Sequence, residues 1–439
     1  MKIALFGGTF NPPHIGHIRA AKSLCREICP DLLYILPASL PPHKMIDAGD
    51  NPAHRFAMAR LAFRGLPCDT VVSALELCRR GKSYTSDTLA YLKTLHPDAE
   101  FFLYVGADML ESFESWHNFR EISDGCTLVT APRAPEEEKE LLSCGKRFEK
   151  EYGSRVLFLP LTPFRAASTT LRAEIARGDT KECKKLLTDD ILGYIIENKL
   201  YSGRKSAENV TSEETLCEME QALPTLIDDK RRAHTLSVCE TALRLAEIFF
   251  PLYGYEKELL RDLRAAALCH DMMKCRTEEE LISYLSQFMR NFEGAPSVYH
   301  SYASAYYALE KYKVNARVFR SIYYHTTGCA DADLFEKLIF LSDYIEPTRS
   351  YSACRALHDT VFDGLFALLQ NGALTKEAAD ELLTRAVVQS LNDTYAHLLR
   401  ENRPVCPELF SARAFLEKEL SEKKRRSFMQ NNTERREKT

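Results

Sequence analysis

Short apolar runs alternate with segments of helical periodicity along residues 1–203, and this alternation restricts the fold more than any other feature. Each run is rich in branched or aromatic residues and is bounded by glycine, proline or polar residues, as is typical of buried strands. The runs are KIALFGG, LLYILP, AEFFLYVG, CTLVTAP and RVLFLPL, with helical segments such as NPAHRFAMARLAF between them. We therefore expect an α/β domain over residues 1–203 with a mostly parallel, doubly wound sheet that binds ligands at the carboxyl ends of its strands.

The chain changes character after residue 203. The polar stretch SGRKSAENVTSEE lacks periodicity, and we assign residues 204–215 to a linker. Long helical patterns follow, as in HTLSVCETALRLAEIFF, LLRDLRAAALCHDMMK and DLFEKLIFLSDYIEP, so residues 216–418 are expected to form an all-α domain. Residues 419–439 are basic and polar, which predicts a disordered tail.

Composition limits the function classes. The 439 residues are 45% hydrophobic and 27% charged with a net charge of −4, which is ordinary for globular domains and does not favour nucleic-acid binding. No apolar run is long enough to span a bilayer, and a strand replaces the charged and apolar regions of a signal peptide, so no membrane partner and a cytoplasmic location are expected. The 14 cysteines form no CxxC pair, and most are expected to be reduced thiols. The oligomeric state stays open, with a homo-oligomer as one possibility.

The stretch FGGTFNPPHIGH follows the first expected strand. Gly7 and Gly8 would form the turn into a helix, where missing side chains let backbone N–H groups approach an anion. Two prolines suit the helix entrance, and His14 and His17 would then share one face. Paired imidazoles over such a turn suit a polyphosphate, while the alternative is a plain strand-turn-helix unit with two surface histidines.

The string GGTFNPPHIGH resembles the HxGH signature of the adenylyltransferase superfamily, and specifically that of the bacterial nicotinate-nucleotide adenylyltransferases. PASLPPHK, SYTSDTL, GADMLESFESW, ASTTLR and GYIIENKLY follow in the family's order, so the resemblance covers about residues 1–203. It implies a Rossmann-like fold of the nucleotidyltransferase type. It also implies that a phosphate oxygen of nicotinate mononucleotide attacks the α-phosphorus of ATP, which releases pyrophosphate and gives deamido-NAD without a covalent enzyme intermediate.

The same resemblance implies the residues that bind ATP and act on its phosphates. A carboxylate and a glycine are useful near the ribose and Mg²⁺, and a hydroxyl, a helix N-terminus and a guanidinium can hold the leaving pyrophosphate. Arg172, taken alone, equally fits a surface ion pair. The expected catalytic residues are His14, His17, Lys44 and Arg172, and the expected ATP contacts are Gly7, Gly8, Thr9, Phe10, His17, Gly106, Asp108, Ser168, Thr169 and Arg172.

For nicotinate mononucleotide, the resemblance implies four contacts. Trp116, the only tryptophan, would stack on the pyridine ring, and Tyr84 and Thr85 would place backbone groups against the nicotinate carboxylate. Lys44 would pair with a phosphate. The alternatives are a Trp116 that fills the core and a solvated Lys44. A different HxGH adenylyl- or cytidylyltransferase with another acceptor is the alternative function.

A second set of polar residues lies in the helical half, beginning with an apolar helix that ends in AAALCHD. A buried His-Asp pair at the base of such a helix needs compensation, and divalent metal ions would supply it. Each histidine could instead be a hydrogen-bonded structural group. The candidate ligands are His234, His270, Asp271, His300, His325 and Asp343.

This order of residues resembles the HD-domain phosphohydrolases, and HTLSVCETA, ALCHDMMK, YHTTG and FLSDYIEP resemble the bacterial HD family that splits diadenosine tetraphosphate symmetrically into two ADP. The resemblance implies a di-metal site, with iron expected, at which activated water attacks a phosphorus. His234, His270, Asp271 and Asp343 would hold one metal, and Asp271 with His300 and His325 the other. Lys274 would steady a phosphate oxygen, unless it is an exposed helix lysine. The alternatives are a metal-stabilised sensor that binds a nucleotide without cleaving it, and a phosphohydrolase with another substrate.

Overall fold

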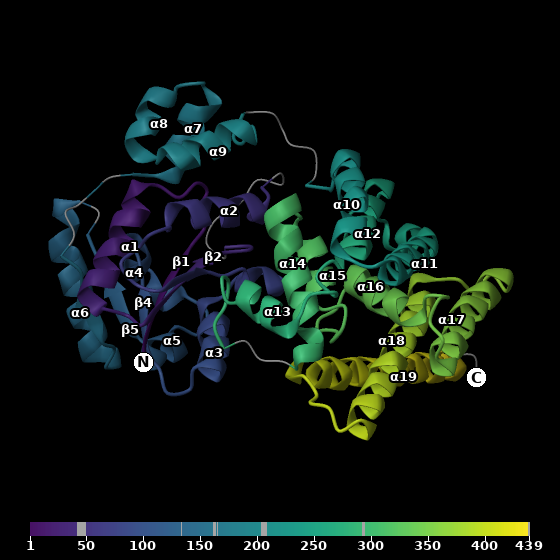
Figure 1. The fold of residues 1–439 in the computed structure, drawn as a ribbon. Helices are drawn as coiled ribbons and strands as arrows, with labels where there is room; N and C mark the ends of the chain where they lie inside the picture. Colours follow the sequence, from purple (N-terminus) through teal and green to yellow (C-terminus); the bar gives the residue numbers. More distant parts are fainter. Residues whose placement is uncertain are drawn as a thin grey trace. The chain divides into compact units, whose positions relative to one another are not determined.

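The computed structural model describes residues 1–41, 50–132, 134–160, 164, 166–202, 209–291 and 295–437. It divides into two compact units, one with Met1–Asn209 and Leu285–Phe292, the other with Val210–Tyr284 and Glu293–Thr439. The first unit contains a sheet with helices, and the described residues of the second contain helices without strands, as expected (Figure 1).

Six parallel strands form the sheet of the first unit, in the order β3-β2-β1-β4-β5-β6. The sequence predicted five of them and missed β3, because its apolar run is only Val71–Val72, whereas the equally short β6 lies within the longer apolar run RVLFLPL. The order reverses on either side of β1, so the carboxyl ends of β1 and β4 form the switch point at which doubly wound sheets bind ligands. The strands are Lys2–Gly8 (β1), Leu32–Pro37 (β2), Thr70–Val72 (β3), Glu100–Tyr104 (β4), Thr127–Thr130 (β5) and Val156–Phe158 (β6).

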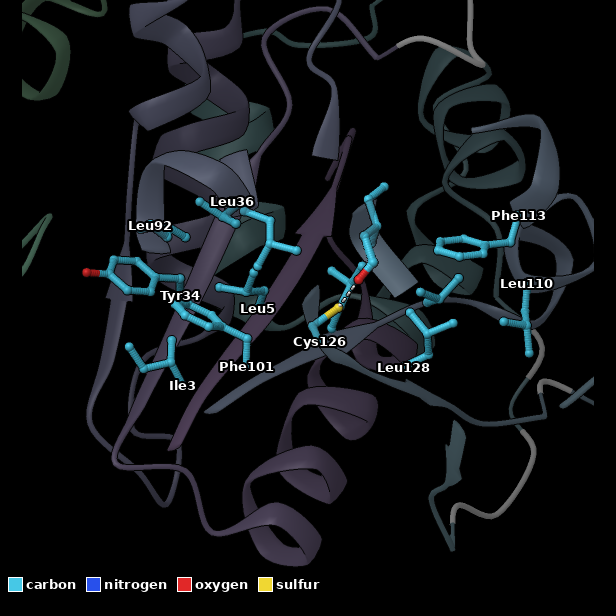
Figure 2. Close-up of a cluster of buried hydrophobic side chains, with 14 of the residues drawn as sticks. Ile3, Leu5, Tyr34, Leu36, Leu92, Phe101, Leu110, Phe113, Cys126 and Leu128 are labelled. Carbon is cyan, nitrogen blue, oxygen red and sulfur yellow. Dashed lines mark hydrogen bonds between the residues drawn. The ribbon is translucent and has the colours of Figure 1, made fainter. Parts of the chain in front are cut away.

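Helices cover both faces of this sheet. Ile3 and Leu5 of β1 pack with α3 to α6 in one buried cluster, part of which Figure 2 shows. Phe6 faces the other way, where its ring contacts Phe63 just after α2. This alternation follows from the two-residue period of a strand that is buried on both faces. The helices are Ile15–Ile28 (α1), Pro52–Ala62 (α2), Thr85–Leu95 (α3), Ala107–Glu111 (α4), Phe119–Gly125 (α5), Glu138–Tyr152 (α6), Ser168–Ala176 (α7), Thr180–Leu186 (α8) and Asp189–Glu197 (α9).

In the second unit, α11 and α12 pack against each other and against several other helices. Helix α11 lies against α12 and α16, and α12 lies against α15. The buried residues of α11 recur at helical spacing and give it an apolar face, whereas α12 is buried continuously from Ala265 to Cys269. The helices are Glu213–Leu226 (α10), Asp229–Tyr253 (α11), Leu260–Cys269 (α12), Glu278–Leu285 (α13), Tyr299–Tyr312 (α14), Ala316–Tyr323 (α15), Leu334–Ile345 (α16), Ser352–Gln370 (α17), Lys376–Arg400 (α18) and Pro407–Glu437 (α19).

Two segments differ from the sequence expectations. Helix α10 begins at Glu213, inside the expected linker, because the Ser212 hydroxyl caps it by accepting a hydrogen bond from the N–H of Thr215. Helix α19 continues to Glu437 and so includes most of the expected tail, whose lysine, arginine and glutamate residues favour helix.

The cysteines largely follow the expectation of reduced thiols. Cys25 and Cys68 are joined as a disulfide, and the other described cysteines are free. Within the described ranges, no helix combines the length and the apolar character needed to cross a membrane.

Candidate active site and metal centre

A cavity of about 380 Å³ lies at the carboxyl ends of β1 and β4. Most of the predicted nucleotide contacts line it, although they come from segments spread between residues 7 and 172. Asp108 is not among the lining residues but lies exposed on α4, whose buried positions are taken by Ala107 and Leu110. Lys44 lies outside the described residues. The predicted residues that line the cavity are Gly7, Gly8, Thr9, Phe10, His14, His17, Tyr84, Thr85, Gly106, Trp116, Ser168, Thr169 and Arg172.

The turn after β1 requires a glycine at position 8. A Cβ atom there would lie 2.8 Å from the ring of Phe10. Phe10 itself has a φ of 50°, in the left-handed region, so the chain folds back and its buried ring comes to lie beside Gly8. The backbone of this turn therefore faces the cavity without a side chain.

The two histidines of the motif lie together at the start of α1. His14 is the N-cap, so the helix begins two residues later than the prolines suggested. Its backbone N–H donates to Nδ1 of His17 at 3.1 Å, and the two rings stack with centroids 3.8 Å apart. A Cβ atom at Gly16 would lie 3.0 Å from Nδ1 of His14, so the residue between the histidines must be small. The predicted pairing of the imidazoles is confirmed.

Helix α7 also lines the cavity, beside the loop that precedes His14. The hydroxyl of Ser168, its first residue, donates to the carbonyl of Pro12 at 2.9 Å. Arg172, one turn later, donates from Nη1 to the carbonyl of Asn11 at 2.7 Å. These bonds fix the loop before His14 to the N-terminus of α7, where backbone N–H groups favour an anion.

The remaining wall carries aromatic side chains. Trp116 packs against Phe113, with ring centroids 5.2 Å apart, at the margin of the hydrophobic core, and it also lines the cavity. Its ring is thus partly packed in the core and partly open to the cavity, and its stacking on a ligand stays a prediction. The ring of Tyr84 stacks on that of His117 at 4.3 Å, and Thr85 begins α3. A planar ligand ring would find several stacking partners here.

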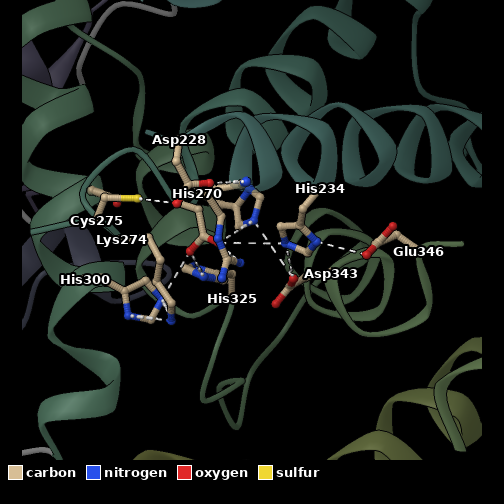
Figure 3. Close-up of polar contacts among 12 residues, drawn as sticks. Asp228, His234, His270, Lys274, Cys275, His300, His325, Asp343 and Glu346 are labelled. Atoms are coloured by element: carbon tan, nitrogen blue, oxygen red, sulfur yellow. Dashed lines mark hydrogen bonds and ion pairs between the residues drawn. The ribbon is translucent and has the colours of Figure 1, made fainter. Parts of the chain in front are cut away.

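In the second unit, six predicted ligands from five segments converge (Figure 3). Asp271 lies at the centre of the group. Its Oδ1 is 3.2 Å from Nε2 of His300 and 3.5 Å from Nε2 of His325, and its Oδ2 is 3.5 Å from Nε2 of His270. Two sets of ligand atoms are close enough together to hold an ion, namely His234 with His270 and Asp343, and His270 with Asp271 and His325.

The tautomers of two histidines fit a bound cation. Nδ1 of His270 hydrogen bonds to the carbonyl of Ala267 at 2.7 Å, and Nδ1 of His325 to the carbonyl of Ile322 at 2.8 Å. Since a carbonyl can only accept, each Nδ1 carries a proton, and in the neutral ring each Nε2 presents a lone pair toward Asp271. A lone pair that faces a carboxylate in a buried site is repulsive, so a cation must lie between them, either a second proton on the imidazole or a metal ion. These residues therefore fit divalent metal ions.

Charged groups surround these ligands. His234 lies between two carboxylates. Its Nε2 is 3.0 Å from Oδ1 of Asp343, and its Nδ1 is 3.0 Å from Oε1 of Glu346. Arg231 Nη1 is 2.7 Å from Oδ2 of Asp271, and Arg349 Nη2 is 2.6 Å from Oδ1 of Asp343. The side chains of Arg231 and Arg349 are 29% and 31% exposed, so they reach solvent while they hold buried carboxylates.

The electrostatics keep ligand-competent protonation states on three of these residues. Burial and the Lys274 ammonium lower the pKa of His300 to about 4, so its imidazole is neutral at pH 7. Burial opposes ionisation of Asp271, but the neighbouring histidines outweigh it and hold its pKa well below the usual range. Asp343 is similar, with Arg349 as the main stabilising charge against burial. Burial also opposes the imidazolium of His234, yet hydrogen bonds to Asp343 and Glu346 raise its pKa to about 9.

Comparison with known proteins separates the chain into the same two parts. Residues 5–174 match the model of the cytidylyltransferase-like family. The nicotinate-nucleotide adenylyltransferase of Bacillus subtilis is 31% identical over 200 residues, which cover 46% of this chain and 98% of that protein. A protein of Exiguobacterium sibiricum named "Probable nicotinate-nucleotide adenylyltransferase" is 35% identical over 206 residues, which cover 46% of this chain and all of its own length. The chain belongs to the nicotinate-nucleotide adenylyltransferase family.

C-terminal to the adenylyltransferase domain in the sequence, residues 231–348 match the HD domain model. The predicted fusion of the two domains is therefore confirmed. A crystal structure from Clostridium acetobutylicum, described as a "predicted HD superfamily hydrolase involved in NAD metabolism", is 25% identical, covers 46% of this chain and 97% of its own, and has a TM-score of 0.37.

Sequence reasoning missed several residues of both sites. In the adenylyltransferase domain, Glu76, Thr88 and His117 also line the cavity. In the HD domain, Glu346 and the two arginines contact the ligand group. A carboxylate three residues after Asp343 lies on the same helical face, so its spacing could have indicated Glu346. The arginines carry no such signal, because arginine is common on helix surfaces.

Proposed function

We propose that the adenylyltransferase domain transfers AMP from ATP to nicotinate mononucleotide and releases pyrophosphate and deamido-NAD. The observation that carries this proposal is the stacked His14–His17 pair over the glycine turn, in a cavity at the switch point of the sheet. Family membership supports the same reaction.

The residues of the cavity then divide between the two substrates. His14 and His17 donate hydrogen bonds to triphosphate oxygens as charge develops, while the N-terminus of α7 and Arg172 hold the leaving pyrophosphate. Mg²⁺ would accompany ATP and neutralise part of its charge. Because the nucleophile is a phosphate oxygen that is already ionised, positioning and charge neutralisation suffice without a general base.

The acceptor fits the aromatic wall. Trp116 offers a face for the pyridine ring, and the backbone of Tyr84 and Thr85 at the start of α3 offers N–H groups for the nicotinate carboxylate. We also propose that Lys44 pairs with the acceptor phosphate, as the resemblance to the nicotinate-nucleotide adenylyltransferases implies.

We further propose that the HD domain hydrolyses diadenosine tetraphosphate symmetrically to ADP at a di-metal centre. Asp271 lies between two groups of histidines, so one carboxylate can bridge two ions, with His234, His270 and Asp343 on one side and His300 with His325 on the other. Bound divalent ions, with iron as the proposed metal, would activate water and neutralise phosphate charge.

The chain's own cations favour a polyphosphate substrate. Lys274 Nζ lies 3.1 Å from Nε2 of His300, and Arg231 and Arg349 border the same ligands. Three cationic side chains beside a metal centre suit the several negative charges of a dinucleotide polyphosphate. Burial lowers the pKa of Lys274, while Asp271 opposes that shift.

The fusion supplies an internal control for the first experiment. We expect His17→Ala to lose at least about a hundredfold in pyrophosphate release from ATP and nicotinate mononucleotide while the same protein keeps its hydrolase activity. Near-normal transfer by His17→Ala would contradict the proposal. Preference for phosphopantetheine over nicotinate mononucleotide as acceptor would favour another transferase of the superfamily.

The reciprocal experiment tests the HD domain. We expect His270→Ala to lose diadenosine tetraphosphate hydrolysis and to keep AMP transfer, because the metal-ligand groups share no residue with the lining of the adenylyltransferase cavity. Metal analysis of the wild-type chain belongs to the same experiment. Bound metal without hydrolysis of any phosphate compound would favour a sensor and contradict the proposed activity.

A further inference from the structure

A buried carboxylate in the adenylyltransferase cavity has no role in the reaction described so far. Glu76 lies in the short 3-10 helix Leu75–Cys78, is only 7% exposed and lines the cavity. Its Oε1 accepts a hydrogen bond from the hydroxyl of Thr88 at 3.1 Å. Thr88 is buried in the first turn of α3, three residues after Thr85.

The same carboxylate reaches a second segment through Ser83. The Ser83 hydroxyl accepts hydrogen bonds from the N–H groups of Ser39 at 3.0 Å and Leu40 at 3.3 Å. With its acceptor positions used in this way, its own proton is available to Glu76, to which it hydrogen bonds. The backbone N–H of Ser83 also donates to the carbonyl of Leu40 at 2.8 Å. The chain after β2 is therefore tied to the turn before α3.

A cation completes this network. Arg79 donates from Nη2 to the hydroxyl of Thr88, and its charge stabilises the carboxylate of Glu76. Burial raises the pKa of Glu76, while Arg79, Thr88 and Ser83 act in the opposite direction. Glu76 is thus a carboxylate whose ionised form is destabilised by burial. It connects the turn before α3 to the segment after β2, and both lie on the proposed acceptor side of the cavity.

We propose that Glu76 is a positioning residue that sets the affinity for the mononucleotide acceptor by fixing the Tyr84–Thr85 turn against the segment after β2. The inference rests on the proposed AMP transfer to nicotinate mononucleotide. Backbone N–H groups recognise a carboxylate only when their directions are fixed, so loosening the turn weakens acceptor binding. The proposed ATP contacts come from the glycine turn and α7. Among the described residues, Glu76, Ser83 and Thr88 make no hydrogen bond to either, although the segment after β2 is joined to the glycine turn through Ala38 and Arg55.

The test is a comparison of KM values for the two substrates in the full-length protein. We expect Glu76→Ala and Thr88→Val each to raise the KM for nicotinate mononucleotide at least about tenfold while the KM for ATP changes by less than about twofold. Glu76→Gln keeps an oxygen that accepts from Thr88 and should restore much of the acceptor affinity. Ser154→Ala is the matched control, because Ser154 is equally buried but precedes β6 at the opposite edge of the sheet.

The outcomes separate this inference from the proposed function. Ser154→Ala should change neither KM value. If wild-type protein transfers AMP but Glu76→Ala and Thr88→Val leave the acceptor KM unchanged, or raise the KM values for both substrates together, the positioning role is wrong. If wild-type protein transfers no AMP to nicotinate mononucleotide, the proposed function itself fails. Should Glu76→Ala not fold, Thr88→Val decides the matter, because it removes one hydroxyl with little change in volume.

Discussion

Gly16 and His14 are in such close contact that a Cβ atom on Gly16 would lie 3.0 Å from the imidazole Nδ1. The His14 ring is itself stacked on His17, so it has little freedom to move away. The glycine between the two histidines thus preserves their arrangement, although it lies in the first turn of a helix where alanine is the better helix former.

Gly16→Ala should therefore separate activity from stability. We expect kcat for AMP transfer to fall at least about tenfold through the displaced imidazoles, with a change in unfolding free energy within about 1 kcal/mol. Gly193→Ala is the control, since a Cβ there meets no atom within 4 Å in the middle of α9. That variant should gain about 1 kcal/mol and keep full activity. Equal kcat values for the two variants would refute the steric explanation.

Asp271→Asn should remove the bridge between the two ligand groups. The amide presents one neutral oxygen in place of two that share a charge, so we expect bound metal per chain to fall by about half or more and hydrolysis to disappear. Elemental analysis and a diadenosine tetraphosphate assay measure the two effects. The exposed Asp359→Asn variant should change neither, and full metal content in Asp271→Asn would argue against a bridging carboxylate.

Chelation should destabilise the HD domain selectively. A ligand that binds only the folded state, present at about a thousand times its Kd, contributes about 4 kcal/mol, which is lost when the metal is removed. We expect calorimetry of the full-length protein to show a lower unfolding temperature for the HD transition and an unchanged one for the adenylyltransferase transition. In His270→Ala, a chelator should have little further effect. A shift of both transitions would show that the chelator acts elsewhere.

Asp380→Asn should destabilise the HD domain through Lys337. The Lys337 ammonium is 6% exposed and lies 3.5 Å from Asp380, which also accepts from Tyr253 at 2.6 Å and from Lys423. Loss of this carboxylate leaves a buried charge without its main partner, so we expect a cost of about 3 kcal/mol at pH 7. The neighbouring Glu381→Gln removes an exposed helical ion pair and should cost less than about 0.5 kcal/mol. Denaturant unfolding compares them, and equal costs would contradict the argument.

The same pair predicts a pH dependence. Burial opposes ionisation of Asp380, but Lys337, Lys423 and Tyr253 together lower its pKa from the usual 3.8. A carboxylate with a depressed pKa stabilises the fold above its unfolded pKa, and this contribution disappears as the pH falls through the folded pKa. The difference in stability between wild type and Asp380→Asn should therefore be constant above about pH 5 and shrink below about pH 4. A stability difference between the two proteins that stays constant down to pH 3 would contradict this assignment of the titration to Asp380.

Much of both sites could be predicted from local patterns. The glycine turn, the paired histidines and the helix at ASTTLR appear as short strings, because each depends on the chain within a few residues. In contrast, Glu76 appears as one acid in SALELCRR. It is connected through Ser83 to Ser39 and Leu40, which lie more than forty residues before Ser83. Glu346 contacts His234 across 112 residues.

The sequence by itself determined the alternation of strands and helices, the break between an α/β and a helical half, and the residue types that handle phosphate and metal. Those features follow from the spacing of apolar residues, from the residues that favour turns and from side-chain chemistry, which are local properties of a chain. Only the tertiary structure decided that β3 joins the sheet, that Asp108 lies outside the cavity, that Trp116 serves both core and cavity, and that Glu76, Arg231 and Arg349 reach the two sites. Such outcomes depend on packing between distant segments, where a side chain's direction is fixed by neighbours that no local pattern contains.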